Sequence, residues 1–165
     1  MKKVLLILAC GIATQLSYAQ ATPKWADKAK KAVFSIVTYD KDNKIKNTGN
    51  GFYINENGTA LSDYTLFEGA ERAVIINADS KELPVLRILG ANSMYDIVKF
   101  NTEADKKTIA LKSASQPASV GETVYLLPYS TQKAATCQTG TVTKVDTIGD
   151  KAYYYTLAMT TNEKP

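Results

Sequence analysis

Residues 49–70 have the sequence GNGFYINENGTALSDYTLFEGA, and this stretch decides the fold. Residues 51–54 combine aromatic and β-branched side chains and predict a strand. The pair Asn57-Gly58 is typical of a tight hairpin turn, and residues 59–62 predict the returning strand. We expect a short helical corner between that strand and Ala70. The stretch therefore predicts an antiparallel hairpin that leads into a corner.

Strand patterns continue on both sides of this hairpin. Residues 33–39 alternate with a period of two, and the polar residues 40–44 then predict a turn. Three further strands are expected, at residues 73–77, 83–89 and 96–100. Pro84 predicts an edge or a bulge in the second of these, and residues 90–95 are expected to form a loop. Six short strands at this spacing predict a small closed β-barrel.

The flanking segments predict three further parts of the chain. Thr22 and Pro23 predict the start of a short helix over residues 24–31, with Thr22 as N-cap and Trp25 packed against the body of the protein. A polar linker follows the barrel, and three more strands are expected at residues 122–127, 137–145 and 152–156. The sequence thus predicts an all-β protein with a helical segment (20–31), a first β-barrel (32–101), a linker (102–119) and a partial second β-barrel (120–165).

The first 19 residues predict a signal peptide. Lys2 and Lys3 precede an apolar run, and Ser17-Tyr18-Ala19 resembles a cleavage site. The run is too short, and too interrupted by polar residues, for a membrane span. The alternative is a lipoprotein signal that leaves Cys10 acylated. We expect an exported protein, periplasmic or extracellular, or an outer-membrane lipoprotein in the alternative case.

Composition excludes several classes of function. Without the two leader lysines, the 20 basic and 16 acidic residues become 18 and 16, which favours neither a nucleic-acid nor a membrane partner. Cys137 is then the one cysteine left, so no intramolecular disulfide is expected, and a buried strand position explains it best. Histidine is absent, and Asp40, Asp42 and Asn43 are too few for a calcium loop. No metal ion or cofactor is predicted.

Six short motifs occur in order along the chain: Gly49-Asn50-Gly51-Phe52, Gly69-Ala70, Asp96-Ile97-Val98, Val120-Gly121-Glu122, Thr139-Gly140-Thr141-Val142 and Tyr155-Thr156-Leu157-Ala158. Together they resemble the motifs of the trypsin fold, and specifically of HtrA-like secreted bacterial serine proteases. The resemblance implies a double β-barrel whose first barrel is complete, with about six strands, and whose second is partial.

The resemblance also implies the positions of a catalytic triad. Thr65 falls where the family carries its histidine, and Asp96 falls where the orienting carboxylate would lie. The Gly-x-Ser-Gly-Gly loop of the nucleophile is absent, since residues 159–165 contain no glycine. A threonine hydroxyl has no basic form near neutral pH and cannot replace histidine as general base. We therefore expect Asp96 to be a vestige that hydrogen-bonds the corner around Thr65.

Three functions remain open at this point. The first is a catalytically inactive domain that binds a peptide or protein, for example an extended peptide along a strand edge. The second is the N-terminal part of an active serine endopeptidase whose serine loop lies beyond Pro165. The third is an exported β-rich structural or adhesion module whose protease-like motifs are coincidental.

Overall fold

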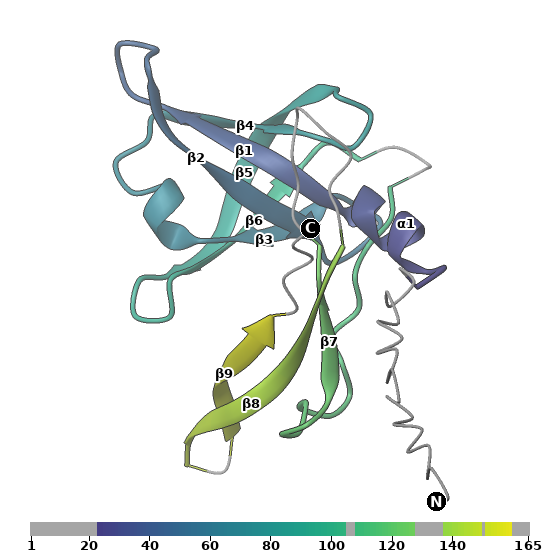
Figure 1. The fold of residues 1–165 in the computed structure, drawn as a ribbon. Helices are drawn as coiled ribbons and strands as arrows, with labels where there is room; N and C mark the ends of the chain where they lie inside the picture. Colours follow the sequence, from purple (N-terminus) through teal and green to yellow (C-terminus); the bar gives the residue numbers. More distant parts are fainter. Residues whose placement is uncertain (1–22, 105–107, 128–136, 150, 160–165) are drawn as a thin grey trace, which may run out of the picture.

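The computed structural model describes residues 23–104, 108–127, 137–149 and 151–159 (Figure 1). The expected signal peptide, Cys10, Thr22 and the segment after Met159 lie outside these residues, so the export signals stay predictions. Within the described ranges, no helix has the length and apolar character needed to cross a bilayer.

The described residues form short helical turns and nine strands. The helical turns are α1 (Ala26–Ala29) and two 3-10 helices, η1 (Lys30–Ala32) and η2 (Tyr64–Leu66). The strands are β1 (Val33–Tyr39), β2 (Ile45–Tyr53), β3 (Thr59–Ser62), β4 (Arg72–Ile76), β5 (Glu82–Asn92), β6 (Ile97–Thr102), β7 (Thr123–Leu126), β8 (Gln138–Ile148) and β9 (Lys151–Met159).

Strands β1 to β6 close into an antiparallel barrel in the order β1-β2-β3-β6-β5-β4 (Figure 1). Alternate residues point inward, and every strand contributes to one core. The core consists of Phe34, Ile36, Tyr53, Ala60, Ile75, Leu83, Val98 and Phe100. The Phe34 ring packs edge-on against Tyr53 and Phe100, with centroid distances of 4.8 and 6.2 Å. The six-stranded barrel predicted from the strand spacing is confirmed.

Strands β7, β8 and β9 form a separate antiparallel sheet beside the barrel (Figure 1). Val142 of β8 is fully buried, and Cys137, directly before β8, is buried as expected. The all-β prediction of one complete barrel, a partial second sheet and a short N-terminal helix is therefore confirmed.

Strand boundaries differ from the sequence prediction where backbone pairing extends beyond the residues that show an alternating hydrophobic pattern. β2 begins at Ile45 rather than at residue 51, because its polar first half pairs with β1 along an exposed hairpin. The prediction that residues 90–95 form a loop is wrong in part, since β5 continues to Asn92 by pairing with β6. Of the edge or bulge predicted at Pro84, the structure agrees with the bulge: Pro84 pairs with Val74 inside the barrel, and the register with β6 shifts directly after it, between Val85 and Arg87.

The N-terminal helix is shorter than predicted. α1 has four residues and its N-cap is Trp25, without a side-chain capping bond. The small residues Ala26 and Ala32 are fully buried, so the helical segment lies close to the body of the protein at these two positions. The large indole of Trp25 lies beside this contact. Trp25 contacts Tyr125 of β7 edge-on at 5.2 Å and so packs against the body of the protein as expected, but it is 51% exposed and lies at the surface rather than in the core.

Candidate functional site

The corner after β3 is held by contacts from β2. Leu66 of η2 occupies the space that a side chain on Gly49 would need, so the missing Cβ lets the corner approach the strand. The Asn47 side-chain amide donates a hydrogen bond to the Leu66 carbonyl at 3.2 Å. Both contacts come from residues 17 to 19 positions earlier in the chain, and they fix η2 against the barrel wall.

Asp96 and Thr65 are in direct contact, as the resemblance implied. The Thr65 backbone N–H and its hydroxyl each donate a hydrogen bond to Asp96 Oδ1, both at 2.7 Å. Asp96 lies in the turn between β5 and β6 with φ +49°, and it does not begin the sixth strand as predicted. Its left-handed backbone directs the carboxylate towards η2. The hydroxyl bond of Thr65, followed by its backbone bond, lowers the pKa of Asp96, so this carboxyl is ionised at neutral pH.

A second carboxylate, Asp63, lies at the same corner. It is the N-cap residue of η2 but makes no side-chain capping bond. Partial burial raises the pKa of Asp63, and the negative charge of Asp96 raises it further. No sequence motif marked Asp63 as a site residue, and its position two residues before Thr65 was the available signal.

A cleft of about 630 Å³ opens beside the two carboxylates, between the barrel and β7. Among the described residues, its lining is mainly apolar and aromatic and includes no Lys or Arg. The lining residues are Val33, Asn50, Gly51, Phe52, Leu61, Ser62, Asp63, Tyr95, Asp96, Ile97, Leu111, Tyr125, Leu126 and Leu127. The cleft thus joins the protease-like corner of the first barrel to the first strand of the second sheet.

The linker contributes to this cleft through Leu111. The Leu111 backbone N–H donates a hydrogen bond to the carbonyl of Tyr53 at 2.9 Å, which holds the linker on the barrel. Neither this contact nor the contribution of β7 could be found from the sequence, because both depend on how distant segments pack.

The cleft offers little for nucleophilic chemistry. Ser62 is the one serine among the lining residues that the structure describes, and its hydroxyl donates a hydrogen bond to the Asn50 carbonyl at 2.7 Å. Cys137 is not among the lining residues, and the sequence contains no histidine that could take a proton. In the described part of the chain, no group of three His, Cys, Asp or Glu side chains could hold a metal ion. What the cleft provides is apolar surface and negative charge.

No family model matches this sequence, and no curated protein matches it. The solved structure of a serine endoprotease from Yersinia pestis is similar, with a TM-score of 0.61 and 16% sequence identity. The match covers 75% of this chain and 46% of that one, so this chain spans less than half of the length of that structure. At this identity the likeness establishes the fold alone. Together with the closed barrel and the second sheet, it shows that the chain has a trypsin-like peptidase fold.

Proposed function

We propose that this protein is an exported, catalytically inactive domain of trypsin-like peptidase fold that binds an extended peptide in the cleft. The observation that carries the proposal is the bond from Thr65 Oγ1 to Asp96. The resemblance implies a proton-accepting histidine at the position of Thr65. Thr65 instead has a hydroxyl that donates a hydrogen bond to the Asp96 carboxylate. With no histidine in the sequence, the general base of a Ser-His-Asp triad is missing from these residues.

The cleft lining supports peptide binding. Tyr125 and Leu126 of β7 remain 37% and 49% exposed, although they line a concave and largely apolar surface. Among the described residues β7 pairs only with β8, so its other edge has backbone groups that could pair with an added strand. Backbone hydrogen bonds to β7 would provide affinity for the peptide, and the apolar lining would determine which peptide side chains are preferred.

A peptidase assay tests the inactive part of the proposal. Purified full-length protein is incubated with an unfolded protein substrate, with and without a serine-directed covalent inhibitor. We expect no turnover and no covalent labelling. Turnover that the inhibitor abolishes would favour an active serine endopeptidase and overturn the proposal.

A binding assay with matched variants tests the cleft. Peptides selected from a display library are titrated against wild type, Leu126→Asp and Ile148→Asp. Leu126 lines the cleft, whereas Ile148 is 57% exposed at the far end of β8 and is not a lining residue. We expect Leu126→Asp to weaken binding about tenfold or more, because a charge would face apolar ligand surface. Ile148→Asp should bind like wild type. Equal binding by both variants would place the ligand elsewhere and contradict the proposal.

Export has its own test. Intact mass of the protein recovered from an exporting host should correspond to a chain that begins at Gln20. A mass that includes acyl groups on Cys10 would support the lipoprotein alternative, and an uncleaved chain in the cytoplasm would contradict export.

A further inference from the structure

We propose that the cleft prefers peptides carrying a Lys or Arg side chain among apolar residues, and that Asp63 contacts the cationic group. This inference rests on the proposed function and adds the chemical class of the ligand to it.

The charged residues that the structure describes in the cleft are both acidic. Asp63 and Asp96 line it, and none of the other described lining residues is Lys or Arg. This local negative charge occurs in a chain whose formal net charge is +4, so it does not simply follow the overall charge. A cleft with apolar walls and one sign of charge concentrates its electric field and attracts ligands of the opposite sign.

The two carboxylates differ in what they can offer to a ligand. Asp96 Oδ1 already accepts both bonds from Thr65. Asp63 has neither a hydrogen bond nor an ion pair from its side chain to another described residue. It is partly withdrawn from water and close to a like charge, and a ligand cation would relieve both costs. Asp63 is therefore the carboxylate that a ligand can reach and pair with.

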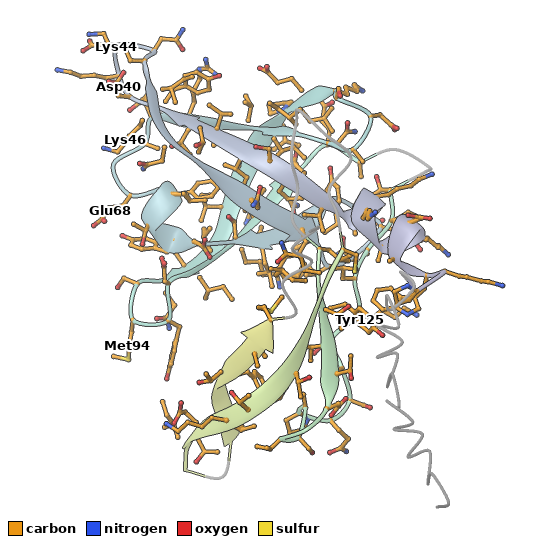
Figure 2. All side chains as sticks on the ribbon, viewed as in Figure 1. Asp40, Lys44, Lys46, Glu68, Met94 and Tyr125 are labelled. Atoms are coloured by element: carbon orange, nitrogen blue, oxygen red, sulfur yellow. The ribbon has the colours of Figure 1, made fainter. Side chains whose placement is uncertain are left out.

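Apolar surface continues from the cleft past the carboxylates. Tyr95 and Ile97, on either side of Asp96, are 48% and 42% exposed, and both line the cleft. Met94, one residue further along the turn, is 79% exposed at the tip of the β5–β6 hairpin (Figure 2). A ligand cation at Asp63 would thus have apolar side chains of the protein around it. The methylene stem of a Lys or Arg, and apolar neighbours in the peptide, match this surface.

The test compares short capped peptides with an identical apolar sequence and Lys, Gln or Glu at the central position. Their affinities are measured by fluorescence anisotropy with full-length wild type, Asp63→Asn and Asp42→Asn. Asp42 is exposed in the β1–β2 turn and is absent from the cleft lining, so the third protein carries the same charge change at a remote place.

For wild type we expect the Lys peptide to bind about two- to fivefold more tightly than the Gln peptide, as for an exposed ion pair, and the Glu peptide to bind least. The preference should shrink at high salt. Asp63→Asn should remove the difference between the affinities for the Lys and Gln peptides. Asp42→Asn should retain the difference.

An unchanged Lys-to-Gln ratio in Asp63→Asn, or no preference in wild type, would overturn the inference. If the Gln peptide still binds in those cases and Leu126→Asp abolishes that binding, the proposed peptide-binding function stands. If none of the peptides binds wild type, while peptides from the display library do, the ligand class is wrong. If no peptide of either kind binds, the proposed function falls together with the inference.

Discussion

Asp96 accepts two hydrogen bonds from one residue, Thr65, through its backbone N–H and its hydroxyl, each at 2.7 Å. The acceptor lies in the β5–β6 turn with φ +49°, and the donors lie in η2, 31 positions earlier. Two corners of the barrel that are separated in sequence by β4 and β5 are thus connected at the edge of the cleft. The sequence resemblance assigns these two positions to triad residues, which stays a prediction, whereas the observed geometry is that of a structural clamp.

Substitutions at Asp96 should separate two contributions to stability, that of its left-handed backbone and that of its side-chain hydrogen bonds. Asn tolerates a left-handed backbone and keeps an acceptor oxygen, Gly keeps the backbone freedom alone, and Ala keeps neither. We expect the melting temperature to fall in the order Asn, Gly, Ala, with Asp96→Ala the least stable. Thermal unfolding followed by circular dichroism measures the order. Equal melting temperatures for all three variants would show that the clamp contributes nothing to stability.

The pH dependence of stability should have two opposed components near pH 3.8, the reference pKa of aspartate. Because the pKa of Asp96 is lowered by folding, its contribution is present at neutral pH and is lost as pH falls below 3.8 through the folded pKa. Because the pKa of Asp63 is raised, its ionised form opposes folding, and stability is regained as pH falls towards 3.8.

Denaturant unfolding at a series of pH values would separate the two groups. Asp63→Asn should be at least as stable as wild type at neutral pH and should lack the gain on mild acidification. Asp96→Asn should lose the component of acid destabilisation below pH 3.8 that wild type shows. Parallel pH profiles for wild type and both variants would contradict these assignments.

Gly51 should not tolerate a side chain. A Cβ there would lie 2.5 Å from the ring of Phe34 and 2.8 Å from the Leu61 carbonyl on the paired strand β3. Neither the core ring nor the backbone can move freely, so we expect Gly51→Ala to cost about 1–3 kcal/mol of stability.

Gly90 provides the matched control, because a Cβ there would meet nothing within 4 Å. Gly90→Ala should be neutral or stabilising by up to about 1 kcal/mol. Chemical denaturation gives both values. A Gly90→Ala variant as destabilised as Gly51→Ala would show that close packing is not the cause.

Trp25 is the single tryptophan of the chain and reports on the contact between the N-terminal turn and β7. With half of its surface exposed, it should be readily quenched by acrylamide. Tyr125→Ala should increase quenching further, because the edge-on ring at 5.2 Å shields one side of the indole. The pair should be worth about 0.5–1.5 kcal/mol in a double-mutant cycle. Quenching that Tyr125→Ala leaves unchanged would contradict the contact.

The sequence alone predicted much of the first barrel. Local features were predicted correctly: the strand at residues 33–39, the Asn57-Gly58 turn and the strand at residues 59–62. Each depends on contacts within a few residues of the chain, so a local pattern is enough to predict it. The motif order placed Thr65 beside Asp96, and their contact is present. The domain boundaries of the sequence analysis, by contrast, stay predictions.

Only the tertiary structure decided the features that depend on distant contacts. Pairing with β6 extended β5 through Asn92, and the turn after it moved Asp96 out of the strand into a left-handed conformation. Close approach of Ala26 and Ala32 left Trp25 at the surface. The cleft itself, with Asp63 at the corner and Leu126 on its far wall, is assembled from segments more than 60 residues apart. Composition determined that no histidine of this sequence could act as a base, whereas packing of the second sheet on the barrel determined where the cleft lies.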